Sequence, residues 1–472
     1  MSPLSHSKAA PRRILSTTDG VVMVVGLVVG AGIFRTPPLV ASNVPDAVAI
    51  LAVWLIGGAI ALIGALCYAE LASAYPHAGG EYHVLQRAFG KFASFLLGWS
   101  RLTVLQTGSI ALLAFVFADY AVRLLPTDFG GSPFATPLIA ALAIIGLTIV
   151  NVLGLRHGRA TQYALTAGVL VGLAMVIAAG LYIWLAGATP AAVSAAAEPV
   201  QGGNISRYAL AFVFVLLTYG GWSEAAYLSA ELRDRQRGVT RTLIWGVAAV
   251  TIIYLLTNAA YLAALGTSGM ASSSAVAVDV MESVAGTAGA AVVGIIVMAA
   301  ALSSANGTMI TGARGNYAVG SDVSPLAMLG VWSDTKDERD SGAPRAALVA
   351  QCIVSLLLVM LGASTRAGFE TMVAYTAPVF WLILFLMGIA LFVLRSRDPL
   401  MDRPFRVPLY PILPAIFCLT SVAMLWSSVA YAGRGALLGC GVMLAGVPVF
   451  LLGRARARRD AEVALLRAET TT

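Results

Sequence analysis

Two glycine-rich stretches carry the residues best suited to chemistry in this sequence. The first is Gly26–Phe34, with glycines at 26, 30 and 32, and the second is Thr218–Glu224, with two adjacent glycines followed by a carboxylate. Glycine weakens a helix by about 1 kcal/mol relative to alanine, and hydrocarbon offers no water to satisfy the backbone groups that a break frees. Both stretches therefore predict an interrupted helix whose free amides and carbonyls line a polar site.

An interrupted helix suits a zwitterionic ligand. Free amides at the start of one half-helix, together with the positive end of its dipole, favour a carboxylate. Free carbonyls at the end of the other half favour an ammonium group or a metal cation. An amino acid carries both groups a short distance apart, so the two stretches predict an amino acid site. The alternative is that the glycines only permit close packing between neighbouring helices.

The elements that carry these stretches are membrane helices. Of the 472 residues, 59% are hydrophobic and 11% charged, and the mean hydropathy is +0.85. This composition excludes an ordinary soluble enzyme, a disordered chain and a nucleic-acid-binding domain, and no alternating ten-residue segments indicate a β-barrel. We predict an all-α integral membrane protein whose twelve apolar transmembrane segments are 16–40, 47–75, 92–123, 136–154, 160–186, 206–232, 242–266, 285–314, 343–363, 369–395, 407–431 and 434–453.

The distribution of basic residues predicts the orientation. With the N-terminus inside, 24 of the 30 lysines and arginines fall in inside loops or tails, and Arg101 falls within the third span. Cytoplasmic loops of membrane proteins are enriched in these residues. The pattern predicts a multi-pass plasma-membrane protein, surrounded by membrane lipid, with both termini cytoplasmic and no nucleic-acid partner. The five basic residues outside are Arg35, Arg123, Arg207, Arg366 and Arg434.

The two interrupted spans are the first and the sixth. These are matching positions if spans 1–5 and spans 6–10 are two structural repeats, and such matched breaks indicate a transporter site near the membrane midplane. The predicted division is a cytoplasmic tail (1–15), a first five-helix repeat (16–186), a second (206–395), helices 11 and 12 (407–453) and a second cytoplasmic tail (454–472).

Four blocks of sequence resemble the amino acid–polyamine–organocation superfamily of amino acid permeases. They are Gly26–Phe34 (GxxxGxGIF), Tyr68–Trp99 (YAEL, P, GGEY, AFG, GW), Asn306–Ala318 (NG, TGAR, YA) and Arg403–Leu409 (RPFRVPL). The last block is typical of the L-type amino acid transporter branch. The resemblance implies a leucine-transporter-like 5+5 inverted repeat with two further C-terminal helices. It also implies secondary transport by alternating access, with no catalytic residues and no cofactor beyond a coupling ion.

The resemblance further implies where the first span contacts an amino acid substrate. The substrate carboxylate is expected at the backbone amides of Gly30, Ala31 and Gly32. The ammonium group is expected at carbonyls near Val25 and Val28.

In the sixth span, carbonyls near Leu217 and Tyr219 are expected to complete the ammonium site. Selectivity for the substrate side chain is expected from Leu217, Trp222 and Ser223, and Tyr219 or Trp222 is expected to close the site. The full set of sixth-span site residues is Leu217, Tyr219, Gly220, Gly221, Trp222 and Ser223.

The coupling ion stays open between H⁺ and Na⁺, as does simple exchange. Many superfamily members carry a lysine in span 5 at the place where sodium-coupled relatives bind sodium, and Val169 stands there in this chain. Ser303 and Ser304 are candidate sodium ligands, with helix–helix hydrogen bonding as the alternative. Glu224 at mid-membrane is a candidate proton carrier, a partner for a basic substrate, or a structural carboxyl.

Neutral L-amino acids are the expected substrates, because of the Arg403–Leu409 signature and the apolar Leu217 and Trp222. Cationic amino acids or polyamines bound through Glu224 are one alternative, and a sensor that binds without transporting is another. No cysteine lies in the outside loop 124–135, so we expect no disulfide-linked heavy chain of the kind that animal relatives use.

Two further charged residues have expected ion-pair partners. Glu70, at the cytoplasmic end of span 2, is expected to pair with Arg87, Arg233 or Arg314. Arg101, near the inner end of span 3, is expected to pair with an acidic residue or to extend toward the membrane surface.

Overall fold

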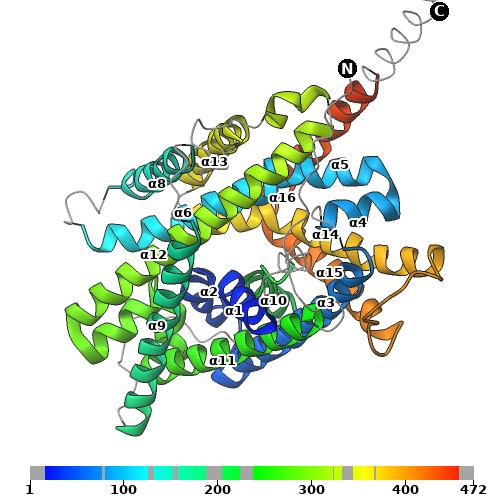
Figure 1. Cartoon of the computed structure of the whole chain (residues 1–472). Helices are drawn as coiled ribbons and strands as arrows, with labels where there is room; N and C mark the ends of the chain where they lie inside the picture. The colour runs from blue at the N-terminus through cyan, green and yellow to red at the C-terminus, as the bar shows by residue number, and fades with distance from the viewer. Residues whose placement is uncertain are drawn as a thin grey trace, which may run out of the picture.

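A computed structural model describes residues 16–76, 80–125, 132–152, 158–187, 205–223, 238–322, 324–331, 344–365 and 368–455. Within these ranges every regular element is a helix, as Figure 1 shows. Ten of these helical segments are long and apolar enough to cross a membrane. The predicted class, an all-helical multi-pass membrane protein, is therefore confirmed.

The first predicted span is broken where its glycines lie. Helix α1 (Thr17–Val28) ends and α2 (Gly32–Ala41) begins on either side of residues 29–31. The short helix α4 (Gly80–Phe89) was not anticipated by the hydropathy pattern, because it is amphipathic and carries charges at both ends. The other helices of this half are α3 (Ala47–Ala74), α5 (Lys91–Ser100), η1 (Arg101–Leu105), α6 (Gln106–Arg123), α8 (Ala135–Val152) and α9 (Gly158–Leu185).

In the sixth predicted span, the helix ends well before the predicted end of the span. Helix α10 (Ile205–Thr218) ends at the second glycine stretch, and residues 219–223 form turns. Helix α12 (Val276–Asp322) begins earlier than residue 285, because a short helix precedes a kink at Gly286, whose φ is 61°. The remaining helices are α11 (Gly238–Ser272), η3 (Ser324–Gly330), α13 (Arg345–Thr365), α14 (Gly368–Arg397), α15 (Ile412–Ala432) and α16 (Arg434–Leu444).

The helices pack as two groups. Helices α1, α2, α3, α10 and α11 contact one another and form what we call the core group, and η1, α6, α8, α12 and α13 form the frame group. Helix α9 contacts both α11 and α12, and α14 packs against α6 and α15 (Figure 1). Both helix breaks adjoin helices of the core group, because α1, α2 and α10 end or begin at them.

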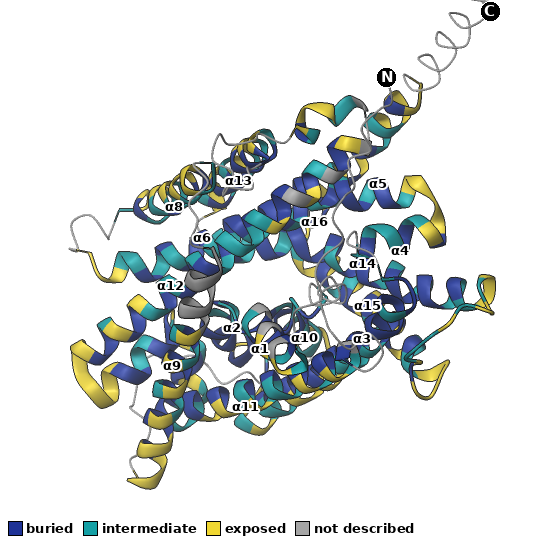
Figure 2. Cartoon of the chain, viewed as in Figure 1, coloured by how far each residue is buried: buried dark blue, intermediate teal, exposed yellow. Residues whose placement is uncertain are grey.

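Figure 2 colours the chain by burial: buried residues are concentrated where helices adjoin one another, and exposed residues lie along the outside of the bundle. Large apolar side chains on those outer faces include Trp184, Trp426 and Leu437, which are 70%, 75% and 71% exposed. An apolar surface of this extent is unfavourable in water and stable in lipid.

The third predicted span contains a π-helical turn, η1, between α5 and α6. A π-helical turn disturbs the regular i→i−4 bonding of the backbone. The hydroxyl of Tyr375, in α14, donates to the carbonyl of Thr103 in this turn at 2.8 Å. Tyr375 therefore has a structural contact that holds α14 against the third span.

Candidate functional site

At the first helix break, one of the three amides predicted to bind a carboxylate already has a hydrogen-bond partner. Gly30 N donates to Val28 O at 2.8 Å, so the Gly30 amide is already used within the break. The amides of Ala31 and Gly32 lie at the N-terminal end of α2, where a helix leaves its first amides without intrahelical acceptors. Among the three amides predicted to meet a carboxylate, the geometry therefore favours those of Ala31 and Gly32.

Gly30 and Gly32, the two glycines of this break, also lie against neighbouring helices. A Cβ atom on Gly30 would lie 3.2 Å from Ser304 Oγ of α12, and one on Gly32 would lie 3.1 Å from Thr218 Cγ2 of α10. The glycines thus permit close packing as well as the break. The two interpretations drawn from the sequence are both compatible with this geometry.

The second break is a tight turn. After α10, Tyr219 N donates to Val215 O and Gly220 N donates to Leu217 O, each at 3.0 Å. Gly221 has a φ of 103°, a left-handed conformation that a residue with a Cβ adopts only with strain. The carbonyl of Leu217, predicted for the ammonium site, accepts this turn bond and keeps a second lone pair.

A tyrosine that the sequence did not single out joins the two breaks. The hydroxyl of Tyr254, in α11, lies 2.9 Å from Val28 O and 3.1 Å from Thr218 O. The hydroxyl of Thr36 also lies 2.8 Å from that of Thr218. Val28, at the end of α1, and Thr218, at the end of α10, are therefore brought together. A lone tyrosine in an apolar span gives no sequence signal for this role.

Two predicted site residues direct their side chains away from the first break. Tyr219 is fully buried, and its hydroxyl donates to Trp54 O of α3 at 3.0 Å. The Trp222 ring is 4% exposed and meets Tyr68 of α3 with ring centroids 5.0 Å apart. Aromatic rings bury large apolar areas, and α3 supplies the complementary surface. In this conformation both rings are packed against α3, and neither is free to close the site.

Half-buried residues near the second break are candidates to line the pocket for the substrate side chain. A Cβ on Gly220 would lie 3.9 Å from Phe380 Cζ, which comes from α14. Phe380, Leu217 and Ser223 are all of intermediate exposure. Phe380 was missed because its span is apolar throughout, so only its position against the turn identifies it.

The residues predicted to bind a coupling ion differ in how close they lie to the first helix break. Ser304 faces the first break through its contact with Gly30, and Ser303 is buried beside it on α12. Val169 is a buried apolar residue of α9. Val25, predicted beside the ammonium group, is buried in α1 and its carbonyl accepts from Val29 N at 2.7 Å. Glu224 lies outside the described residues, so its three roles stay predictions.

On the predicted outer side, Arg35 lies at the centre of an ionic cluster. Its Nη2 is 3.1 Å from Glu370 Oε1 of α14, and its Nε is 3.8 Å from Asp119 Oδ2 of α6. Its Nη1 also donates to Ser274 O at 3.4 Å. The guanidinium therefore ties α2, just beyond the first break, to two helices and a loop.

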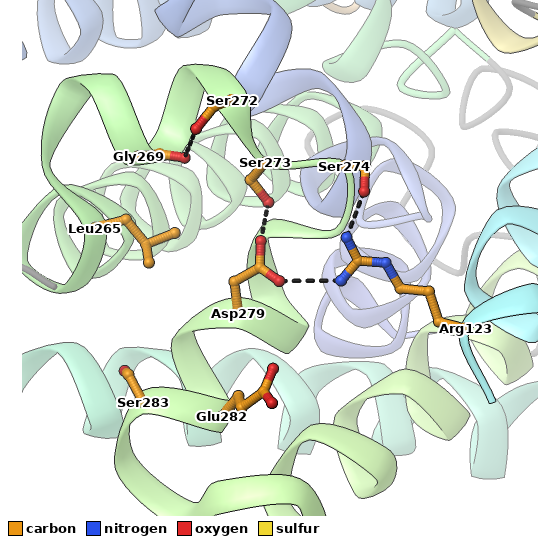
Figure 3. A pocket seen from close by; sticks show the side chains of 9 residues that line it. All are labelled: Arg123, Leu265, Gly269, Ser272, Ser273, Ser274, Asp279, Glu282 and Ser283. Carbon is orange, nitrogen blue, oxygen red and sulfur yellow. Dashed lines mark hydrogen bonds and ion pairs between the residues drawn. The ribbon is translucent and has the colours of Figure 1, made fainter. Parts of the chain in front are cut away.

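A second cluster flanks this one around a cavity of about 430 Å³ (Figure 3). Arg123 Nη1 lies 3.0 Å from Asp279 Oδ1, and Arg123 also donates to the Ser274 hydroxyl. The cavity opens at the ends of α6 and α11 and the start of α12. Its lining is Arg123, Leu265, Gly269, Ser272, Ser273, Ser274, Asp279, Glu282 and Ser283.

On the predicted cytoplasmic side, Glu70 has partners that differ from those expected. Its carboxylate accepts from Arg395 Nε at 2.7 Å and from Val407 N at 2.7 Å, and it lies 3.3 Å from Arg403 Nε. The prediction of Arg87 as a partner is wrong, because the end of α14 and the segment after it lie closer to the end of α3. The YAEL and RPFRVPL blocks thus form one buried ionic cluster.

Arg87 instead pairs with Asp398, at 3.3 Å, and its guanidinium lies 4.8 Å from the centre of the Tyr75 ring. Tyr75 donates to Asp398 Oδ2 at 3.0 Å. The hydrogen bonds from Tyr75 and Arg87 lower the pKa of Asp398. The other two predicted partners of Glu70 give no contact to compare, because Arg233 lies outside the described residues and the side chain of Arg314 is not described.

The prediction that Arg101 pairs with an acid is confirmed. Arg101 Nη1 lies 3.3 Å from Glu81 Oε2, which belongs to the GGEY block at the start of α4. The hydroxyl of Tyr68, from the YAEL block, donates to the other oxygen of Glu81 at 2.7 Å.

The sequence is similar to known amino acid transport proteins over most of its length. The sequence model of the amino acid permease family matches residues 15–444. The large neutral amino acids transporter small subunit 2 of Homo sapiens is 32% identical over 444 residues, which cover 91% of this chain and 78% of that protein. The b(0,+)-type amino acid transporter 1 of Mus musculus is 31% identical over 407 residues, covering 86% of this chain and 80% of that protein.

Proposed function

Because the chain belongs to the amino acid permease family, we propose that it is a secondary transporter that moves neutral L-amino acids across the plasma membrane by alternating access. The observation that carries the proposal is the meeting of the two helix breaks at Tyr254. The amides at the start of α2 and the carbonyls at the ends of α1 and α10 there provide opposite partial charges within one small region.

The substrate carboxylate binds the amides of Ala31 and Gly32, and the ammonium group binds the carbonyls of Val28 and Thr218. A carbonyl oxygen has two lone pairs. Val28 O already accepts from Gly30 N within the break, and the single proton of the Tyr254 hydroxyl goes to either Val28 O or Thr218 O. The hydroxyl therefore holds the two helix ends at a fixed spacing. The Thr218 carbonyl keeps a lone pair for the ammonium group in either case, and the Val28 carbonyl keeps one when Tyr254 donates to Thr218.

The whole chain has twelve transmembrane helices in a leucine-transporter-like 5+5 inverted repeat, with two further helices and both termini cytoplasmic. Supporting this, α1 and α2 share the first span and α10 ends at a glycine turn in the sixth. Breaks at corresponding positions of two repeats are typical of transporters with a midplane site.

The side-chain pocket accepts apolar groups. Of the three half-buried residues near the second break, Leu217 and Phe380 are apolar and Ser223 is polar. One relative is named for large neutral amino acids, which agrees with such a lining. Cationic amino acids or polyamines are the second candidate class, and they depend on the carboxylate of Glu224.

Coupling follows one of three routes. Sodium would bind beside the first break through Ser303 and Ser304, a proton would bind Glu224, and exchange would need neither. The contact between Ser304 and Gly30 favours testing sodium first, because it places a hydroxyl oxygen against the break.

We propose that the chain works without a disulfide-linked heavy chain. The relative from Homo sapiens is named a small subunit, but loop 124–135 of this chain contains no cysteine. All four cysteines are free thiols, at positions 67, 352, 418 and 440.

Uptake into proteoliposomes tests the proposal. Purified protein is reconstituted with unlabelled leucine inside, and accumulation of labelled leucine, alanine, arginine and putrescine is measured with sodium or choline outside. Saturable counterflow of leucine or alanine is the expected result. Counterflow of arginine or putrescine alone would favour the second class, and binding without any counterflow would indicate a sensor.

A further inference from the structure

A line of contacts joins the second helix break to the predicted cytoplasmic side. The Trp222 ring packs T-shaped on Tyr68, with centroids 5.0 Å apart. The Tyr68 hydroxyl donates to Glu81 at 2.7 Å, and Glu81 pairs with Arg101 at 3.3 Å. The side chains of Glu81 and Arg101 are 9% and 17% exposed, so the line is shielded from water along its length.

The ends of this line belong to different helix groups. Trp222 follows α10 and Tyr68 lies in α3, both in the core group, whereas Arg101 lies in η1 of the frame group. Glu81, in α4, bridges them. Movement of the core group against the frame group on this side must therefore change the Tyr68–Glu81–Arg101 contacts.

Trp222 has little room to move independently of Tyr68. A Cβ on Gly64 would lie 2.7 Å from the Trp222 ring and 2.8 Å from the Phe417 ring, so the indole fills a close-fitting recess in α3. Closely packed interiors transmit displacement instead of absorbing it. A shift of the turn at residues 219–223 therefore reaches the Tyr68 ring directly.

We infer that Tyr68 is a positioning residue that couples the turn at residues 219–223 to the Glu81–Arg101 ion pair and so restrains opening of the site toward the cytoplasm. The inference rests on the proposed transport function. The inference gives the YAEL and GGEY blocks a shared role, because Tyr68 belongs to the first block and Glu81 to the second.

The variant Tyr68→Phe isolates the coupling. It keeps the ring against Trp222 and removes the hydrogen bond to Glu81. A hydrogen bond to a charged group shifts an equilibrium by roughly tenfold or more. Loss of the restraint raises the fraction of protein that is open to the inside. Because substrate on the inside binds only this state, its apparent affinity rises with that fraction and the inner KM falls. We expect the ratio of inner to outer KM for leucine to fall by about tenfold.

The experiment uses proteoliposomes in which transporter orientation is determined, so that KM is measured from each side. Glu81→Gln is expected to change the ratio in the same direction, and the double variant is expected to add little to either single change. Tyr182→Phe, at an exposed tyrosine of α9, serves as the control and leaves the ratio unchanged. An unchanged ratio in well-folded Tyr68→Phe, or additive effects in the double variant, would overturn the inference.

Hydrogen exchange of the ligand-free protein separates this inference from the proposed function. Tyr68→Phe and Glu81→Gln are each expected to increase exchange both in α4 and in residues 219–223. An increase confined to α4 would contradict the coupling. If wild-type protein neither binds nor moves any amino acid, the proposed function fails, and the exchange pattern still decides whether Tyr68 couples the two regions.

Discussion

The ionic cluster around Arg35 offers the sharpest test of how the outer side closes. The guanidinium joins α2 to Asp119 of α6 and Glu370 of α14 only when the outer ends of these helices are close together. The variant Arg35→Gln removes the positive charge and leaves two carboxylates near each other. We expect it to favour conformations in which the outer path is open.

The magnitude follows from the exposure of the cluster. Breaking a buried ion pair costs about 3–5 kcal/mol, and an exposed pair contributes about 0–1 kcal/mol. The side chains of Arg35, Asp119 and Glu370 are 15%, 30% and 24% exposed, which places the cluster between these limits. A shift of about 2 kcal/mol corresponds to a population change of roughly 30-fold.

The assay is again KM for leucine from each side of oriented proteoliposomes. Arg35→Gln is expected to lower the outer KM relative to the inner KM, approaching the 30-fold estimate. Arg207→Gln, at an exposed arginine on the same predicted side, is the matched control. A second change, Glu370→Gln in the Arg35→Gln background, is expected to restore part of the ratio by removing an unpaired charge. A folded Arg35→Gln protein with a wild-type ratio would refute the reasoning.

Three other substitutions have expected outcomes. Tyr254→Phe removes the hydroxyl between the ends of α1 and α10; it is expected to weaken leucine binding by roughly tenfold, and calorimetric binding with unchanged affinity would be evidence against the site. Gly221→Ala places a Cβ on a residue whose φ is 103°; it is expected to lower the free energy of unfolding by about 1 kcal/mol or more, which would appear as a lower Tm. The control is Gly307→Ala on α12, where a Cβ would meet no atom within 4 Å, and it is expected to leave the Tm unchanged. Phe380→Ala enlarges the pocket near Gly220 and is expected to shift the kcat/KM ratio for tryptophan over alanine upward; an unchanged ratio would place Phe380 outside the pocket.

Local sequence features predicted the helix breaks well. Glycines weaken a helix locally, and this effect depends on residue type and spacing alone. The ends of α1 and α10 accordingly lie where the glycines do. The turn conformation of Gly221 has the same local origin.

Long-range contacts were harder to predict. Arg395 was not among the three expected partners of Glu70, because the order of the spans does not show that the end of α14 lies beside the end of α3. Tyr219 and Trp222 were expected to face the substrate, and their sequence does not show that α3 offers a recess at Gly64 and a carbonyl at Trp54. Tyr254 acts through two partners far apart in sequence, so only the folded arrangement identifies it.

The central claim is that the two breaks form one amino acid site. The most direct measurement is the Tm of the purified protein against each of the twenty amino acids, agmatine and putrescine, with sodium or choline. A ligand at 100 times its Kd stabilises the folded state by about 2.7 kcal/mol. The account predicts stabilisation by neutral amino acids, diminished in Tyr254→Phe. A well-folded protein whose Tm responds to none of these compounds would contradict it.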